Sequence, residues 1–379
     1  MLSQFGFVGM KWMKYKKIGD LTNVITGGTP STTKPEYWDN GDIPWLQSGC
    51  CQNCDVDFAE KYITQEGYDN SSTKLMPKDS VMIALTGATA GKIGYLNFEA
   101  CGNQSITGIL PCELMNQRYL FYFLLSQREK ILADCIGGAQ PHISQGYVKN
   151  IHVPVIPLEK QKEIVDTLSC LFGIINKRQS EIRLLDNFIK ARFVEMFGSI
   201  YNNKFGYDVM TLQDVCEFIK DGTHQTPTYT HDPINGYKFL SSKDVTSGKV
   251  DWKHLKYIPE ELHNELYKRI SPRKGDILLA KNGTTGVAAI VDRDEVFDIY
   301  VSLALLRPLE IVTSEYLCSA INSLETKQQF DCSLKGIGVP NLHLGEIKKT
   351  KIIVPHIELQ NQFADFVHQV DKSKFMKSF

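Results

Sequence analysis

Two glycine-rich loops carry the side chains best suited to binding a polar ligand. They have the sequences TGATAGK at 86–92 and KNGTTGV at 281–287. A phosphate-binding P-loop needs GxxxxGK followed by Ser or Thr, but Ile93 follows the first loop and Val287 replaces the lysine in the second. Two interpretations remain open. Each loop is a tight strand–turn–strand with glycine at positive φ, or its backbone and Thr, Asn or Lys side chains approach DNA phosphates or base edges.

Three histidines lie in polar loops, where they could act as bases or as hydrogen-bonding side chains. His142 lies in GGAQPHIS, His224 in DGTHQTP and His343 in VPNLHL. None is paired with carboxylates in a way that matches across the chain, so we predict no catalytic residue. The sequence also lacks an Asn/Asp-Pro-Pro-aromatic tetrapeptide and a glycine-rich fingerprint for S-adenosylmethionine or a dinucleotide. We therefore expect no cofactor bound by this chain itself.

One tight cysteine cluster, Cys50, Cys51 and Cys54, contains a CxxC. Structural zinc needs a second pair of ligands, and Cys101 and Cys112 do not have that spacing. The cluster is therefore interpreted as reduced cysteines in a loop, and no metal site is predicted.

The bulk composition is typical of a globular protein with more than one domain. The 379 residues are 42% hydrophobic and 22% charged, with no apolar run of about 18 residues. The first residues are apolar before they are basic, the reverse of a secretory signal peptide, so a cytoplasmic location without membrane contact is expected.

The net charge of −1 is unusual for a nucleic-acid binder, because phosphate contacts usually require a basic excess. A local field depends on where charges lie rather than on their sum. Basic residues cluster at 11–17, 268–274 and 348–351. Each cluster is either a solvated face or a local anion-binding surface.

The chain contains an internal repeat. Pro77 and Gly91 reappear as Pro272 and Gly286, both 195 positions later. Gly28-Thr29 reappears as Gly222-Thr223 at 194, Tyr119-Leu120 as Tyr316-Leu317 at 197, and Gln161 as Gln360 at 199. Thr86 and Gly87 then correspond to Lys281 and Asn282. A register that drifts so slowly indicates a duplicated domain.

Each copy is predicted to be an α+β domain. A short amphipathic helix opens it, at 18–25 or 212–219, and a glycine stops that helix. Apolar runs bounded by turn residues predict strands, followed by a helix and a closing strand. The paired segments are 43–46 with 237–240, 81–85 with 276–280, 92–96 with 287–291, the helices starting near Tyr119 and Tyr316, and 151–157 with 351–355.

A long helix is predicted after the first copy. From 159 to 197 the only Gly or Pro is Gly173, and apolar residues alternate in steps of four and three. This heptad pattern favours a coiled-coil partner, although an amphipathic surface helix is the alternative. A corresponding helix begins near 357 and has about half that length. The heptad positions are Ile164, Leu168, Leu171, Ile175, Ile182, Leu185, Ile189 and Met196.

The repeat and its motifs resemble the specificity (S) subunit of type I restriction–modification systems. The resemblance is carried by VIPLEKQKEIV (155–165), echoed by VPHIELQNQFA (354–364), with IPWLQSG, LTGATAGKIG, GGAQPHIS and FVEMFG. It implies an α+β fold with two tandem α/β target-recognition domains separated by long coiled-coil helices, a pseudo-twofold internal repeat. The implied boundaries are 1–158 and 201–356 for the two domains, 159–200 for the first spacer helix, and 357–379 for a shortened second one.

The resemblance also implies a function. Each domain of a specificity subunit recognises one half of a bipartite, asymmetric site in double-stranded DNA. The helices set the gap and dock two modification (methyltransferase) subunits, and restriction subunits carry an ATP-dependent translocase and nuclease. Such a subunit is not an enzyme, and S-adenosylmethionine, ATP and Mg are expected on its partners. A stand-alone methyltransferase or nuclease, or a truncated allele acting only as a scaffold, are the alternatives.

Candidate site residues follow from glycine content and from divergence between the copies. We expect DNA contacts from Thr86, Thr89, Lys92, Gln140 and His142 in the first domain, and from His224, Lys281, Asn282, Thr284 and Asn341 in the second. Partner docking is expected on the long helix at Leu168, Leu171, Ile175, Ile182, Leu185 and Ile189. Because the second helix is short, we expect that it does not cover Ile182, Leu185 and Ile189 and that these side chains are exposed.

Overall fold

A computed structural model describes residues 14–135, 142–245, 248–334 and 341–377. The chain divides into two compact units, Met1–Asn176 and Lys177–Phe379, and the long helix α6 passes through the division. Each unit is described by itself. Among the described residues, no helix has the length and apolar character needed to cross a membrane.

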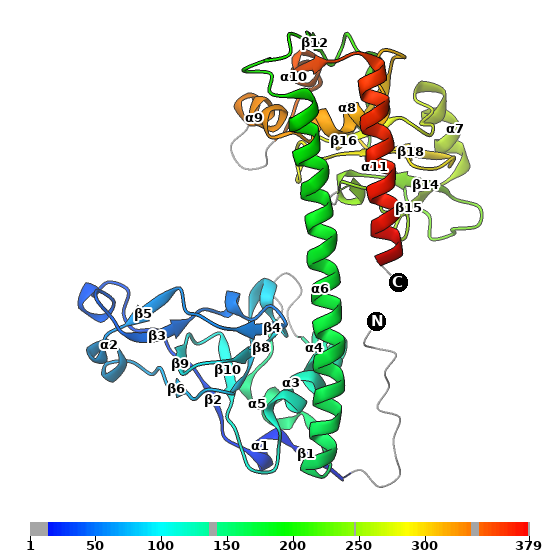
Figure 1. The fold of residues 1–379 in the computed structure, drawn as a ribbon. Helices are drawn as coiled ribbons and strands as arrows, with labels where there is room; N and C mark the ends of the chain where they lie inside the picture. Colours follow the sequence, from blue (N-terminus) through cyan, green and yellow to red (C-terminus); the bar gives the residue numbers. More distant parts are fainter. Residues whose placement is uncertain (1–13, 136–141, 246–247, 335–340, 378–379) are drawn as a thin grey trace. The chain divides into compact units, whose positions relative to one another are not determined.

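Unit 1 combines two sheets, a strand pair and short helices (Figure 1). The strand orders are β2-β10-β7-β8-β4, β5-β3-β9-β6 and β1-β11. The strands are β1 (Lys14–Lys17), β2 (Val24–Thr26), β3 (Ile43–Leu46), β4 (Cys54–Val56), β5 (Lys61–Ile63), β6 (Leu75–Met76), β7 (Val81–Ala84), β8 (Ile93–Leu96), β9 (Ala100–Gly102), β10 (Ile106–Ile109) and β11 (His152–Val155). The helices are α1 (Ile18–Leu21), α2 (Gln65–Asp69), α3 (Gln117–Ser126), α4 (Arg128–Ala133), α5 (Gln145–Asn150) and the first part of α6 (Leu158–Phe197).

Unit 2 repeats this plan. Its strand orders are β13-β19-β16-β17, β15-β14-β18 and β12-β20. The strands are β12 (Asp208–Thr211), β13 (Cys216–Asp221), β14 (Tyr237–Leu240), β15 (Lys256–Ile258), β16 (Ile277–Ala280), β17 (Ala288–Ile290), β18 (Phe297–Ile299), β19 (Leu303–Pro308) and β20 (Lys351–Val354). The helices are the rest of α6 with α7 (Glu260–Arg269), α8 (Ser314–Ile321), α9 (Leu324–Ser333), α10 (Leu344–Lys349) and α11 (Ile357–Lys377).

The paired strands predicted from the sequence are confirmed. The four-residue runs 43–46 and 237–240 are β3 and β14, and both lie beside a parallel neighbour, β9 or β18. Every residue of β7 and of β16 is fully buried, as expected for a central strand that is covered on both faces.

The amphipathic helix predicted at the start of each copy is wrong. Residues 18–21 form only one helical turn, and β2 follows it; in unit 2 the region contains strand β13. The glycine after each strand has a different function from a helix stop. A Cβ on Gly27 would lie 2.0 Å from the carbonyl oxygen of Gly102, and one on Gly222 would lie 2.0 Å from that of Ile299. Close approach of two backbone segments therefore requires glycine at both positions.

That contact also corrects the register of the repeat. Because Gly27 and Gly222 are equivalent, Thr26 corresponds to Asp221 and the local offset is 195. At the ends of β7 and β16 the offset is 196, because Ala84 and Ala280 are equivalent. Ala84 N bonds to Lys92 O as Ala280 N bonds to Val287 O. The first glycine-rich loop is one residue longer.

The corrected register changes the equivalence of the loop residues. Leu85, not Thr86, is the counterpart of Lys281: the amides of both bond to a serine carbonyl, that of Ser105 or of Ser302. Thr86 accordingly corresponds to Asn282. The repeat as judged from the sequence pairs Thr86 with Lys281 and Gly87 with Asn282. Each pair is wrong by one position, because a constant offset of 195 ignores the extra residue in the first loop.

The long helix is confirmed as α6, with 40 residues, and α11 has 21. In unit 2, α11 runs antiparallel to the second part of α6 (Figure 1). The ring of Phe363 lies 5.4 Å from that of Phe197, and further along α11 Lys374 Nζ lies 2.7 Å from the carboxylate of Asp186. The seam predicted between the helices therefore exists in unit 2.

The expected bare stretch at Ile182, Leu185 and Ile189 is wrong. These side chains are half-buried, and Ile189 packs against the core of unit 2, because α11 extends back along α6 as far as Asp186. The exposed apolar side chains of α6 lie elsewhere. They are Leu158, Leu171, Ile174 and Ile175 in unit 1, and Leu184, Phe188 and Val194 in unit 2.

Candidate functional site

In unit 1, the glycine-rich loop lies against the segment that follows the undescribed residues 136–141. Thr86 forms an isolated antiparallel bridge with His142, and Ile143 N donates to Leu85 O at 2.9 Å. The Thr86 hydroxyl donates to Ser105 Oγ at 2.8 Å, and that of Thr89 to Thr86 O at 3.4 Å. The structure therefore brings Thr86, Thr89 and His142 together. Gln140 lies outside the described residues.

Lys92 connects the same loop to the cysteine cluster of unit 1. Its ammonium donates to Gln52 Oε1 at 2.6 Å, and Gln52 lies between Cys51 and Cys54. Gly87 and Gly91 both have φ of +72°, so the prediction of a tight turn with glycine at positive φ is confirmed.

In unit 2 the equivalent loop makes an equivalent set of contacts. Asn282 forms an isolated bridge with Asn341, and Leu342 N donates to Lys281 O at 3.0 Å. Thr284 is exposed at the tip of the loop. The loop and the segment after 340 therefore present Asn282, Asn341 and Thr284 together, on the frame that presents Thr86 and His142 in unit 1.

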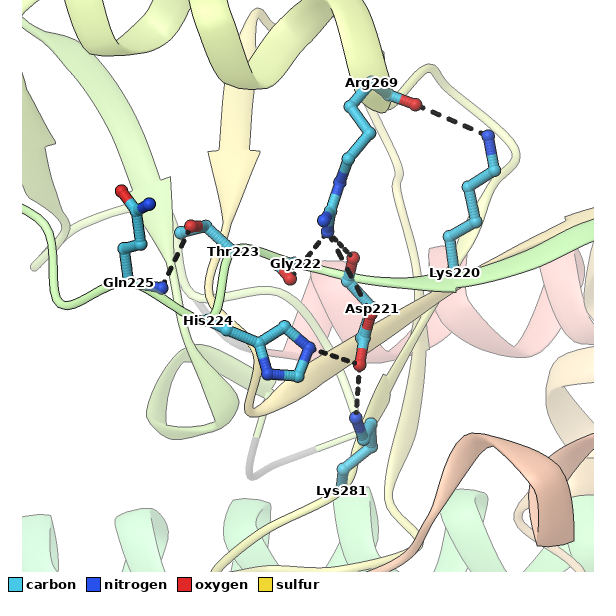
Figure 2. Close-up of polar contacts among 8 residues, drawn as sticks. All are labelled: Lys220, Asp221, Gly222, Thr223, His224, Gln225, Arg269 and Lys281. Atoms are coloured by element: carbon cyan, nitrogen blue, oxygen red, sulfur yellow. Dashed lines mark hydrogen bonds and ion pairs between the residues drawn. The ribbon is translucent and has the colours of Figure 1, made fainter.

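Lys281 does not extend into solvent. Only 6% of its side chain is exposed, and its Nζ donates to Asp221 Oδ2 at 3.1 Å. The same carboxylate oxygen lies 3.1 Å from Nε2 of His224, whose ring is exposed (Figure 2). Lys281 therefore fixes the position of the Asp221 carboxylate, which in turn contacts His224. A direct contact between the Lys281 ammonium and DNA stays a prediction.

The electrostatics of Asp221 favour its ionised form. Partial burial acts to raise the pKa of this carboxyl, but the hydrogen bond and charge of Lys281, followed by those of His224, outweigh burial and hold the pKa below its usual range. The carboxylate is therefore a hydrogen-bond acceptor only.

Arg269, at the C-terminal end of α7, fixes the backbone of the same turn. Its Nη2 donates to the carbonyls of Asp221 and Gly222 at 2.6 and 2.8 Å, while Lys220 Nζ donates to Arg269 O at 3.5 Å (Figure 2). Sequence analysis missed Asp221 and Arg269 as site residues. The signal for Asp221 was its exchange for Thr26 between the copies, which the one-residue register error concealed.

A second histidine–aspartate pair of unit 2 lies in its interior. His263 and Asp298 are buried against each other, with Nδ1 2.7 Å from Oδ2. Within the described ranges, no group of three or more His, Cys, Asp or Glu side chains is arranged to hold a metal ion. The two loop clusters offer hydrogen-bond donors and acceptors, which is the chemistry of recognition.

The sequence matches the family described as the type I restriction modification DNA specificity domain, once over residues 10–184 and again over 205–377. The chain therefore belongs to this family, with two copies of its domain in tandem. Both matches enclose one glycine-rich loop and its bridged partner segment.

Relatives and a solved structure of the same kind are similar to this chain over part or nearly all of its length. The type I restriction enzyme MjaVIII specificity subunit of Methanocaldococcus jannaschii is 24% identical, over 94% of this chain and 85% of the relative. The EcoR124I/EcoR124II specificity subunit of Escherichia coli is 31% identical over 41% of this chain and 40% of the relative. The crystal structure of a type I restriction–modification S subunit from M. genitalium shares the fold, with a TM-score of 0.51, 14% identity, and coverage of 97% and 91%.

Proposed function

We propose that this chain is the DNA-recognition subunit of a type I restriction–modification complex, and that each unit recognises one half of a bipartite, asymmetric site. The observation that carries the proposal is one frame present twice with different side chains at equivalent loop positions. Leu85 and Thr86 in unit 1 correspond to Lys281 and Asn282 in unit 2, and the bridged partners are His142 and Asn341.

Different donor and acceptor groups on the same frame select different bases, because each base pair presents its own pattern in the major groove. The loops are also suited to close approach to DNA, since the turn glycines carry no side chain. We expect unit 1 to contact DNA through Thr86, Thr89, Lys92 and His142. We expect unit 2 to contact it through His224, Asn282, Thr284 and Asn341.

The helices are the proposed docking elements. Leu171 and Ile175 present exposed apolar side chains on α6, and exposed apolar surface of this kind favours a protein partner. Two modification subunits would bind along the helices, and restriction subunits would join them. S-adenosylmethionine, ATP and Mg would be bound by those partners in the cytoplasm, and this chain would carry out no catalysis.

Methylome sequencing tests the proposal. Cells that carry this gene together with the genes of its modification and restriction subunits should show adenine methylation at one bipartite motif with two dissimilar halves. Deletion of this gene alone should abolish that methylation. Purified chain with DNA and S-adenosylmethionine should show no turnover without its partners. Turnover by the chain alone would show instead that it is a stand-alone enzyme. An unchanged methylome after deletion would contradict the proposed function.

A further inference from the structure

His224 is a loop residue of unit 2 whose exposed side chain is oriented by the Lys281–Asp221 pair. Its side chain is 68% exposed, whereas that of Asp221 is 17% exposed. The two form the contact at 3.1 Å, and the same Asp221 oxygen accepts from the buried ammonium of Lys281. The imidazole is therefore anchored on one side and open to solvent on the other (Figure 2).

The anchor determines which ring nitrogen carries the proton. An ionised carboxylate cannot donate a hydrogen bond, so Nε2 of His224 must carry the hydrogen that Asp221 accepts. In the neutral ring the other nitrogen, Nδ1, then has a lone pair and acts as an acceptor. Nδ1 makes no hydrogen bond to any residue that the structure describes.

An outward acceptor restricts what the ring can bind. Phosphate oxygens only accept hydrogen bonds, so they offer nothing to an unprotonated Nδ1. The hydrogen-bond donors of duplex DNA are the exocyclic amines of its bases: N6 of adenine and N4 of cytosine in the major groove, and N2 of guanine in the minor groove. The side chain is thus suited to contact a base edge.

Unit 1 lacks this arrangement. The residues equivalent to Asp221 and Lys281 are Thr26 and Leu85, and the Thr26 hydroxyl pairs instead with Thr107 Oγ1 at 3.0 Å. Thr29 occupies the position equivalent to His224. The contribution of the oriented imidazole therefore belongs to one half-site only.

We propose that His224 is a specificity-determining residue of unit 2, which accepts a hydrogen bond from the exocyclic amine of one base, and that Asp221 is the positioning residue that fixes its tautomer and orientation. The proposal rests on the DNA-recognition function proposed above and names the chemistry of one contact within it.

Two substitutions of His224 test the contact directly. In the complete complex with its methyltransferase subunits, His224→Phe keeps an aromatic ring but removes the acceptor. His224→Asn keeps an acceptor, Oδ1, near the position of Nδ1. Methylome sequencing of each strain gives the base preference at every position of the motif. His224→Phe should lose about tenfold in discrimination at one position, where the wild type requires an amine-bearing base, and His224→Asn should retain most of it.

The identity of that base separates the three amines. Relaxation at an A·T pair assigns the contact to N6 of adenine, and relaxation at a G·C pair assigns it to N4 of cytosine or N2 of guanine. Oligonucleotides with hypoxanthine in place of guanine distinguish the N2 contact, since hypoxanthine lacks that amine.

A matched pair of double variants tests the role of Asp221. Asp221→Asn with Lys281→Leu removes the buried charges but keeps an oxygen that accepts from Nε2. Asp221→Val with Lys281→Leu removes that oxygen as well. Unit 1 folds with Thr26 and Leu85 at these positions, and Arg269 bonds to the backbone carbonyls, so both variants retain the turn. The Val variant should relax the same single position as His224→Phe, and the Asn variant should not.

The outcomes separate this proposal from the function on which it rests. If the wild-type complex methylates no defined motif, the DNA-recognition function fails. If the wild type is specific but His224→Phe leaves every position unchanged, only the His224 contact is overturned. Equal loss across both halves in His224→Phe and His224→Asn alike would show a general structural role and would also overturn it.

Discussion

Arg307 and Asp276 form a buried ion pair in unit 2 that unit 1 does not share. The guanidinium donates from Nε and Nη2 to the two carboxylate oxygens at 2.9 and 2.8 Å, and Nη2 also donates to Ser271 O. The equivalent residues of unit 1 are Leu110 and Ser80, which occupy the same register of the sheet. Such a pair contributes little net stability, but breaking it leaves a buried charge without compensation.

The repeat supplies the control for a prediction about this pair. Arg307→Leu alone should destabilise unit 2 by about 3–5 kcal/mol in urea unfolding, because Asp276 stays buried without a charged partner. Adding Asp276→Ser, which reproduces unit 1, should recover most of that loss. A double variant as unstable as the single one would show that the pair is not the source of the effect.

Asp298 gives the stability of unit 2 a pH dependence. Burial raises the pKa of this carboxyl to about 6, and the hydrogen bond to His263 only partly opposes the shift. The folded state therefore binds the proton more tightly than the unfolded chain does. The stabilising contribution is fully present below about pH 4 and is lost as pH rises through 6.

Comparison with Asp298→Asn isolates that contribution. The difference in unfolding free energy, wild type minus variant, should fall by on the order of 3 kcal/mol between pH 4 and pH 7. Urea unfolding at four pH values measures it. A difference that rises with pH would mean that His263 holds Asp298 ionised in the folded state.

At the scale of elements, a glutamine in each unit fixes the start of the long helix to the same part of the domain. Gln161 accepts from Asn116 N at 2.7 Å and donates to the carbonyls of Leu114 and Ile156. Gln360 makes the same three bonds to the backbone of unit 2, and both side chains are fully buried. The amide joins the helix to the loop before α3 or α8.

Gln360→Leu should therefore destabilise unit 2 by about 2–4 kcal/mol, because three buried backbone groups lose their partner. Thermal unfolding of the purified chain measures the loss. Gln369→Leu, at an exposed position of the same helix, is the matched control and should change stability by less than about 0.5 kcal/mol. Equal effects of the two substitutions would refute this explanation.

Local pattern predicted the elements that are continuous in sequence, and it failed where distant segments decide the outcome. Strand β7 was predictable because Val81–Ala84 is a short apolar run between turns. Residues 212–219 have apolar spacing that also suits a helix, but 212–215 form a turn, and pairing of β13 with β19, more than 80 residues away, makes 216–219 extended. Propensity is weaker than such tertiary contacts.

The candidate site shows the same limit. The glycine-rich loops and their partner segments were predictable from the repeat, and the bridges Thr86–His142 and Asn282–Asn341 bring the predicted residues together. The burial of Lys281 was not predictable, because a lysine is normally exposed unless it is paired. Its partner lies 60 positions earlier, at the end of another strand.

For the whole molecule, two recognition units on one chain should act independently on the two halves of the site. The nearly neutral net charge means that affinity depends on locally placed groups rather than on a general positive field. Thr89 and Lys92 belong to the loop of unit 1, and Thr284 to that of unit 2, and none of the three is fully buried.

A pair of loop variants tests that independence. Thr89→Ala with Lys92→Ala should relax or weaken recognition of one half-site by about thirtyfold or more, since each lost DNA contact costs about 1–3 kcal/mol. Thr284→Ala should affect only the other half. Methylation of a library in which each half-site is randomised separately measures both effects. If either variant alters the preference in both halves, the two units do not recognise their half-sites independently, because a loop contact in one unit then depends on the DNA bound by the other.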